Sequence, residues 1–241
     1  MLRSPTACRT LPCISVCALC ILLSNGAGAA QNGSRLKRAI GPAAILGTAV
    51  LLDPLIRVSH PNGGSRFSRG LAGYTGHLAE YGTVLLGLGT TYVLSDTDAR
   101  HAVRRVARAA AITSVVTRAI KIYVGRARPR AWDDGATFQP VQLESRYNSF
   151  PSGHTALAFA LAQAIDDEID HRPAEIGLYA LSALVGWSRV RQDKHWASDV
   201  VAGGITGIVV TRMLRDGHLF PQHPRMSFTP NGVAVVIPLG F

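Results

Sequence analysis

The sequence predicts an all-α fold: a helical bundle of about six helices with a short C-terminal β-hairpin. From Leu36 onward the chain is rich in Ala, Gly, Leu and Val at helical spacing, and Pro, Gly and Asp interrupt it about once per helix length. A change to alternating β-forming residues comes only near the C-terminus. All four cysteines lie within the first thirty residues, which excludes a disulfide scaffold for the rest of the chain.

The first thirty residues have the order of charge, apolar core and small residues that is typical of a secretory signal peptide. Arg3 and Arg9 precede an apolar run at 11–23, and small residues follow it. This run has thirteen residues, too few for a membrane-spanning helix. We therefore expect residues 1–30 to be removed on export to the bacterial periplasm, and residues 31–241 to form a single domain.

Start and stop signals bound the six helices. Asp53, followed by a proline, stops the first. Ser95 and Asp98 form a capping box that starts the third, and Pro129 marks its end. The expected helices are 36–52, 71–95, 95–129, 153–168, 173–189 and 194–215.

Two apolar stretches, 39–52 and 81–95, contain no Asp, Glu, Lys or Arg and have fourteen and fifteen residues. Because a membrane span needs about twenty residues, we expect both stretches to be buried core helices. The predicted bundle is water-soluble or lies on a membrane surface. In the last helix, Gly203 and Gly207 are four residues apart and permit close approach of a neighbouring helix.

The C-terminal segment predicts a hairpin at 226–241. Pro-Asn-Gly at 230–232 separates two runs of β-forming residues, as in a hairpin turn. We expect this hairpin to pack on the bundle, because packing covers its exposed strand edges.

The charge of the chain narrows the class of partner. Without the two arginines of the signal peptide, 23 of the 25 basic side chains are left against 15 acidic ones, an excess of eight. Such an excess favours anionic partners. We expect that the protein does not bind nucleic acid, because the chain is predicted to be exported and its basic residues are not interleaved with aromatic ones. A phosphorylated small molecule or a lipid phosphate, with peripheral contact to a membrane, fits better.

Cations and a histidine gather near helix ends. Lys121 and Arg128 are seven residues apart, a spacing that returns to nearly the same helical face. His195 and Asp199 are spaced i, i+4, so the carboxylate can accept the Nδ1 proton and leave Nε2 free as a base or nucleophile. Taken alone, such a pair is more often structural. Arg189 adds a planar donor suited to phosphate oxygens.

The fourth helix starts with Pro-Ser-Gly-His at 151–154. This is an ordinary helix-start signal, and it also aims backbone N–H groups at an anion. Together, two histidines, a carboxylate, three cations and this turn fit attack on a phosphate ester. The cations and amides would bind the non-bridging oxygens, while one histidine attacks and the other protonates the leaving alcohol.

The motifs resemble a known family. In chain order they read Lys-x6-Arg-Pro from Lys121, Pro-Ser-Gly-His from Pro151 and Ser-Arg-x5-His-x3-Asp from Ser188. This set resembles the three signature motifs of the type 2 phosphatidic acid phosphatase superfamily, which includes bacterial acid phosphatases, lipid phosphate phosphatases and vanadium haloperoxidases.

The resemblance implies a phosphatase that works through a phosphohistidine intermediate, and the predicted signal peptide makes it an exported one. It implies that His195 is the nucleophile, that Asp199 orients it, and that His154 is the general acid and then the base that activates water. The implied phosphate-binding residues are Lys121, Arg128, Ser152, Gly153 and Arg189. The implied substrate is a soluble phosphomonoester or a lipid phosphate, with a membrane isoprenoid pyrophosphate as the alternative.

Four other functions compete with this hypothesis. A serine hydrolase built on Ser152, His154 and Asp199 lacks the Gly-x-Ser-x-Gly elbow and gives the cations no role. A zinc site on His154, His195 and Asp199 would be repelled by those cations, so we expect no metal ion and no other cofactor. A vanadium haloperoxidase would bind vanadate in the same pocket, but the enzymes of that class are larger proteins than this chain. A non-enzymatic membrane-surface protein would have no use for His195.

Overall fold

The computed structural model describes residues 47–50, 53, 66–131, 135–141, 143–169, 171–217, 225–229 and 232–236. The predicted signal peptide, residues 1–30, lies outside the described residues. Of the first predicted helix, 36–52, only residues 47–50 are described, and they are helical.

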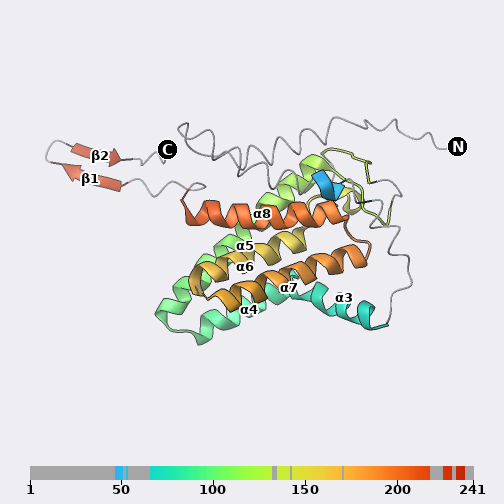
Figure 1. Ribbon diagram of the computed structural model, residues 1–241. Coiled ribbons are helices and arrows are strands. Elements are labelled where there is room, and N and C mark those ends of the chain that lie inside the picture. Colours follow the sequence, from blue (N-terminus) through green and yellow to red (C-terminus); the bar gives the residue numbers. More distant parts are fainter. Residues whose placement is uncertain are drawn as a thin grey trace.

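The described part of the chain is a helical bundle, which confirms the helical class (Figure 1). Figure 1 shows α8, α6 and α7 side by side, and α6 also packs on α5. The third to sixth predicted helices are confirmed with ends that shift by a few residues. The helices are α3 (Arg66–Leu78), α4 (Tyr81–Leu94), α5 (Thr97–Val124), the 3-10 turn η1 (Ser145–Tyr147), α6 (Gly153–Ile169), α7 (Arg172–Arg191) and α8 (Ala197–Arg215).

The ends of α5 differ from the prediction. Asp96, not Ser95, is the N-cap, and its carboxylate accepts the Ala99 N–H at 2.9 Å. The helix ends at Gly125 rather than at Pro129, because Gly125 adopts a left-handed conformation with φ of 59°. A Cβ atom there would lie 1.6 Å from the carbonyl oxygen of Gln139, so only glycine fits.

The predicted helix 71–95 is wrong, because the structure divides it into α3 and α4. Glu80 is extended, with φ of −74° and ψ of 139°. Neither residue at the break, Ala79 or Glu80, is Pro or Gly. Ala79 is buried against Ala158 and Val185 of the neighbouring helices, so tertiary packing rather than local propensity sets the break.

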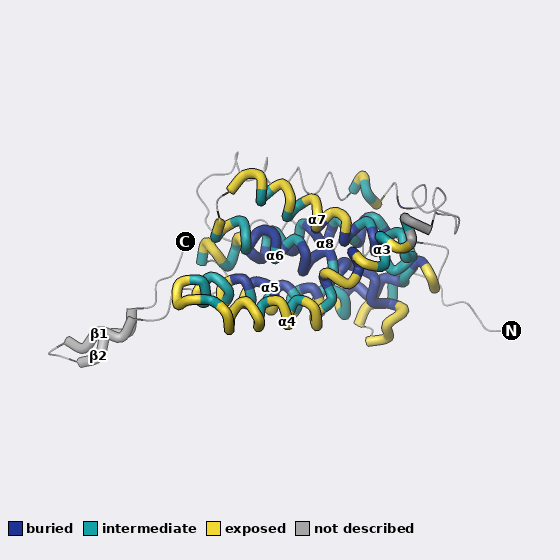
Figure 2. The backbone as a smooth tube through the Cα atoms, turned by 90° about the horizontal axis from the view of Figure 1, so that it is seen from below, coloured by how far each residue is buried: buried dark blue, intermediate teal, exposed yellow. Residues whose placement is uncertain are grey.

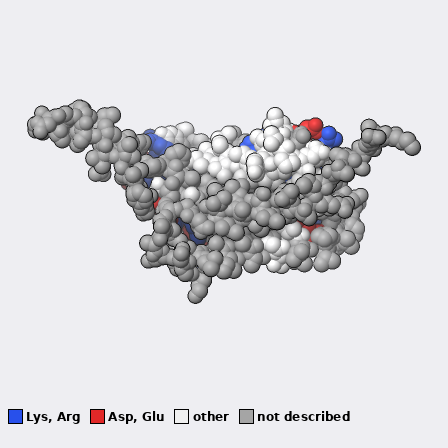
Figure 3. All heavy atoms as spheres, turned by 90° about the horizontal axis from the view of Figure 1, so that it is seen from above, with Lys and Arg blue, Asp and Glu red and all other residues white. Residues whose placement is uncertain are grey.

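The prediction that 81–95 is a buried core helix is also wrong. None of the described residues of α4 is buried, and Leu86 and Leu94 are 74% and 80% exposed. The physical reason is its position at the edge of the bundle, where it packs mainly on α5 and shows as an exposed strip in Figure 2. Figure 3 shows the bundle from above, where the described atoms that are visible are mostly uncharged and most of the charged side chains lie toward the two ends.

Close packing of α6 on α8 fixes the geometry of the site. A Cβ atom on Gly203 would lie 2.5 Å from the Ser152 carbonyl oxygen, and one on Gly207 would lie 2.3 Å from that of Ala156. The predicted close approach at these glycines is therefore confirmed, and Figure 2 shows both helices as largely buried. This approach brings the start of α8 against the start of α6.

Among the described helices, α8 alone is long and apolar enough to cross a membrane by length and composition, and half of its most apolar window is buried in the bundle. The same properties are found in core helices of soluble proteins.

The C-terminal segment holds strands β1 (Arg225–Thr229) and β2 (Gly232–Val236), which pair antiparallel with Thr229 opposite Gly232. Their side chains lie outside the described residues. The packing of a hairpin at 226–241 on the bundle stays a prediction.

Candidate active site

The residues of the three motifs lie in four helices and in the segments next to their ends, where Arg128 follows α5, Ser152 precedes α6 and His195 precedes α8. Lys121 lies in the last turn of α5, His154 in the first turn of α6, Arg189 near the end of α7, and Asp199 in the first turn of α8. The start of α6 is tied to that of α8 by the Ser152 N–H, which donates to the Asp199 carbonyl oxygen at 2.8 Å. A Cβ atom on Gly153 would lie 3.6 Å from Lys121 Cε. The fold thus brings together motif residues from a 79-residue stretch of the sequence, Lys121 to Asp199.

Asp199 is fully buried and holds more partners than the sequence indicated. Its Oδ1 accepts a hydrogen bond from Arg126 Nη1 at 2.6 Å. Its Oδ2 accepts from Ser149 Oγ at 2.5 Å and from the Trp196 N–H at 2.9 Å. Burial alone would raise the pKa of Asp199, but the charge of Arg126 keeps that pKa well below its ordinary value. Asp199 is therefore a carboxylate at every pH of interest.

His195 lies close to Asp199 but is not hydrogen-bonded to it. The distance from His195 Nδ1 to Asp199 Oδ2 is 3.7 Å, and Nδ1 has no hydrogen-bond partner among the described residues. The expected direct hydrogen bond is therefore wrong for this structure, because Ser149 and Trp196 already donate to that oxygen. Burial, with Lys121 and Arg128 nearby, lowers the pKa of His195 to about 4, while Asp199 acts in the opposite direction. Its imidazole is neutral near pH 7, as a nucleophile must be.

The three cations crowd one another. Lys121 Nζ donates to the carbonyl oxygens of Asn148 and Ser149 at 2.9 and 3.3 Å. Burial and the charge of Arg128 lower the pKa of Lys121 to about 7. Burial and Arg128 likewise lower the pKa of Arg189. An anion bound among these cations would relieve their mutual repulsion.

The surroundings of Arg128 Nε and Arg189 Nη2 indicate which donors a bound anion could use. Arg128 Nε is buried without a hydrogen-bond partner among the described residues. A Cβ atom on Gly76 of α3 would lie 2.1 Å from Arg189 Nη2, so α3 approaches this guanidinium as closely as a backbone can. Arg128 Nε is therefore a donor that a ligand could use, and the Arg189 guanidinium lies in the space that Gly76 leaves open.

The turn at 151–154 offers fewer backbone donors than expected. The Ser152 N–H is already used by Asp199, so it cannot bind an anion. The Ser152 hydroxyl accepts a hydrogen bond from Thr155 Oγ1 at 2.9 Å, which leaves its own hydrogen to donate. Gly153 is the first residue of α6, and a helix start leaves such N–H groups without an intrahelical acceptor.

His154 faces the cations from the first turn of α6. Burial and the charges of Arg189, His195 and Lys194 lower its pKa to about 3, while Glu80 acts in the opposite direction. Its ring centroid lies 6.5 Å from that of Tyr81, the first residue of α4. His154 is neutral in the unliganded site, and the charge of a bound phosphate would raise its pKa.

Sequence reasoning missed five groups around this site. Arg126 lies inside the first motif, but its side chain was not separated from other basic residues. Ser149 lies three residues before Ser152 and had no motif signal. Asp53 carries only a helix-stop signal in the sequence. Glu80 and Tyr81 fall in what the sequence reads as one unbroken helix, so only the structure places them beside His154.

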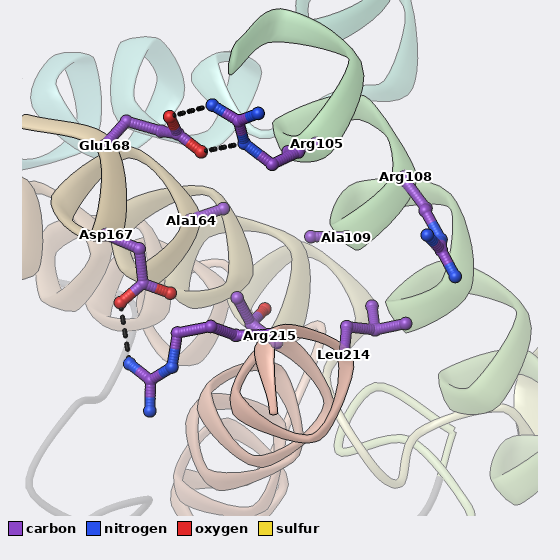
Figure 4. Close-up of a pocket in the computed structure, with 9 residues that line it drawn as sticks. Arg105, Arg108, Ala109, Ala164, Asp167, Glu168, Leu214 and Arg215 are labelled. Carbon is purple, nitrogen blue, oxygen red and sulfur yellow. Dashed lines mark hydrogen bonds and ion pairs between the residues drawn. The ribbon is translucent and has the colours of Figure 1, made fainter. Parts of the chain in front are cut away.

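A cavity of about 390 Å³ lies elsewhere, between α5, α6 and α8 (Figure 4). Its charged groups are largely satisfied, because Arg105 pairs with Glu168 at 2.5 Å and Arg215 with Asp167 at 2.8 Å. None of the motif residues lines this cavity. Within the described ranges, no cluster of three or more His, Cys, Asp or Glu side chains is arranged to hold a metal ion.

Comparison with known proteins gives a family and a fold. A family model described as the PAP2 superfamily matches residues 102–218. Lipid A 1-phosphatase of Porphyromonas gingivalis is 43% identical over 65 residues, 26% of this chain and 15% of that protein. Probable lipid phosphate phosphatase 4 of Arabidopsis thaliana is 35% identical over 142 residues, 47% of this chain and 46% of that protein. The chain thus spans less than half the length of these relatives.

A solved structure shows the same fold. It is the first transmembrane PAP2 type phosphatidylglycerolphosphate phosphatase from Bacillus subtilis, with a TM-score of 0.51 and 19% identity. The match covers 85% of this chain and 94% of that one. The family match includes all three motifs, from Lys121 to Asp199, and these are the residues that the fold brings to one end of the bundle. The region 102–218 of this chain, which carries all three motifs, belongs to the PAP2 superfamily.

Proposed function

We propose that the protein is a lipid phosphate phosphatase that works through a phosphohistidine on His195. The observation that carries this proposal is the meeting of three crowded cations with two neutral histidines at one end of the bundle. The cations match the three non-bridging oxygens of a phosphoryl group. Of the two neutral imidazoles, one can supply the electron pair that attacks phosphorus, and the other can carry the proton that the leaving alcohol needs.

In the first step, the lone pair of His195 Nε2 attacks phosphorus. A P–N bond forms while the bond between phosphorus and the leaving oxygen breaks. His154, which gains a proton once the phosphate is bound, gives that proton to the leaving alcohol. The His195 ring becomes positively charged, and the Asp199 carboxylate beside Nδ1 stabilises that charge.

In the second step, His154 takes a proton from water, and the water oxygen attacks phosphorus. The P–N bond breaks, its electron pair returns to His195, and inorganic phosphate leaves. Lys121, Arg128 and Arg189 hold the phosphoryl oxygens through both steps.

The lipid character of the substrate is supported by α4. This helix begins beside His154 with Tyr81 and continues as an apolar, exposed face with Leu85 and Leu86 at 69% and 74% exposure. Such an apolar patch on a protein surface fits hydrocarbon. We infer that α4 contacts the membrane and guides a lipid phosphate to the site. The printed names of the relatives, lipid A 1-phosphatase and lipid phosphate phosphatase, agree with this class.

Charged substitutions on α4 test this inference. We expect Leu86→Glu to lower kcat/KM for phosphatidate in vesicles by about tenfold or more, since burying one such side chain in hydrocarbon is worth about 1.5–3 kcal/mol. Hydrolysis of a soluble aryl phosphate should be unchanged. The matched control is Ile176→Glu on α7, which is 62% exposed. Equal losses on both substrates, or equal losses in both variants, would overturn the role of α4.

The pH dependence of kcat/KM tests the protonation states. His195 must be neutral, so activity on a soluble ester should be lost as pH falls through about 4. Lys121 must be charged, so activity should also be lost as pH rises through about 7. His154 takes its proton from the monoanion of the bound ester, so it adds no limb of its own, and we expect a bell-shaped profile with an acidic optimum. A profile that stays flat well above neutral pH would contradict the role of Lys121, and Lys121→Arg should extend the profile to higher pH.

A further inference from the structure

A buried ionic network lies behind the motif residues at the start of α8. It contains Asp53, Arg126 and Asp199, whose side chains are 2%, 4% and 0% exposed. Of these three, only Asp199 belongs to the set that the sequence analysis selected. Burying three charges is costly unless each is paired and hydrogen-bonded, so the arrangement calls for a function.

Arg126 is fixed through all three guanidinium nitrogens. Nη1 donates to Asp199 Oδ1 at 2.6 Å, and Nη2 donates to Asp53 Oδ2 at 2.9 Å. Nε donates to the Gly135 carbonyl oxygen at 2.8 Å. The guanidinium also lies 5.5 Å from the centre of the Trp196 ring. Arg126 therefore has one defined position, and it fixes the Asp199 oxygen that faces away from His195.

Asp53 holds the first turn of α8 from 145 residues earlier in the chain. Its Oδ1 accepts the Ser198 N–H at 2.8 Å, and its Oδ2 accepts the Ser198 hydroxyl as well as Arg126. The first N–H groups of a helix have no intrahelical acceptor, and Asp53 satisfies one of them. Asp53 thus fixes the turn that carries Asp199.

The network of Asp53, Arg126 and Asp199 carries one net negative charge. If Arg126 paired with Asp199 alone, the two charges would cancel, and little negative charge would face His195. With Asp53 as a second carboxylate, one guanidinium is shared by two carboxylates, and the group keeps one net negative charge. That charge stabilises the positive ring that forms on His195 when phosphorus is attacked.

We propose that Asp53 and Arg126 are positioning residues for the His195–Asp199 pair. Arg126 sets where the Asp199 carboxylate lies, and Asp53 offsets the charge of Arg126 so that Asp199 acts on His195 as a net anion. This inference rests on the proposed function of His195.

The test is the rate of phosphohistidine formation in a single turnover, measured on the full chain with a soluble aryl phosphate. We expect Asp53→Asn to lower this rate constant by about 10- to 100-fold, the loss typical of groups that orient functional histidines, with KM changed by less than about twofold. A variant that only loses folded protein would show fewer active sites at an unchanged rate constant. Asp167→Asn, the same change in the pair with Arg215, is the matched control.

Arg126→Lys provides a second test that keeps the charge and removes the fork. We expect a similar slowing, because one ammonium cannot bind both carboxylates as Arg126 does. If the wild-type protein forms phosphohistidine, and both Asp53→Asn and Arg126→Lys react as fast as Asp167→Asn, the positioning role is overturned while the proposed function stands. If the wild-type protein forms none, the proposed function itself fails.

Discussion

Replacing His195 with alanine is expected to abolish hydrolysis of phosphate esters, with a loss on the order of 10⁶-fold in kcat, as when the nucleophile of a covalent mechanism is removed. The cations that bind the phosphoryl group stay in place, so binding of a phosphate analogue such as vanadate should be kept. A steady-state assay and a binding titration on the same preparation measure the two effects separately.

The matched control for this change is His101→Ala, which removes an exposed histidine from α5. It should be fully active. Thermal unfolding of both variants shows whether the fold is retained, because His195 is buried and its loss leaves a void. A folded His195→Ala protein with activity near that of the wild type would contradict the mechanism.

Replacing His154 with alanine is expected to give a loss that depends on the leaving group. A proton donor matters most when the leaving alcohol is a poor one, so an alkyl phosphate should lose about 10²–10⁴-fold in kcat/KM. An aryl phosphate of an acidic phenol needs little protonation and should lose much less in the first step. Comparing the two esters in wild-type and variant protein measures this difference directly.

Hydrolysis of the intermediate also needs His154, as the base for water. The phosphohistidine should therefore accumulate in His154→Ala when the aryl ester is used. Equal losses on both esters, with no accumulation, would show that His154 binds phosphate rather than moves protons. Tyr81→Phe, beside the His154 ring, serves as a control for a general disturbance of this corner of the site.

The residues of the three motifs were predictable because their spacing is local and each lies at or near a helix end. The short spacings from Lys121 to Arg128 and from His195 to Asp199 can be read in the sequence, although α5 ends at Val124 and α8 begins at Ala197, so neither pair lies on a single helix. The bounds of α6 and α7 were also close to prediction, since the Pro-Ser-Gly turn at 151–153 and Pro173 are helix-start signals. Local chemistry of this kind does not depend on how the helices pack.

The features that sequence reasoning missed depend on packing between distant segments. The break before α4 comes from the burial of Ala79. The exposure of α4 could not be predicted, since an apolar run of fourteen residues fits a buried core helix equally well. Asp53 and Ser198 are 145 residues apart, and nothing in either local pattern indicates that they meet.

The 3.7 Å separation of His195 and Asp199 has the same origin. Their i, i+4 spacing predicts a hydrogen bond, but Ser149 and Trp196 compete for the same carboxylate oxygen. Periodicity tells which side chains are neighbours. It does not tell which of several donors the carboxylate takes.

The central claim is that His195 carries the phosphoryl group. The most direct measurement mixes the protein with an aryl phosphate, quenches the reaction in alkali, in which phosphohistidine survives, and locates the phosphoryl group by mass spectrometry of peptides. We expect phosphate on His195, in larger amount in His154→Ala and absent from His195→Ala. Phosphate on Ser152 or His154, or turnover without any phosphorylated peptide, would contradict it.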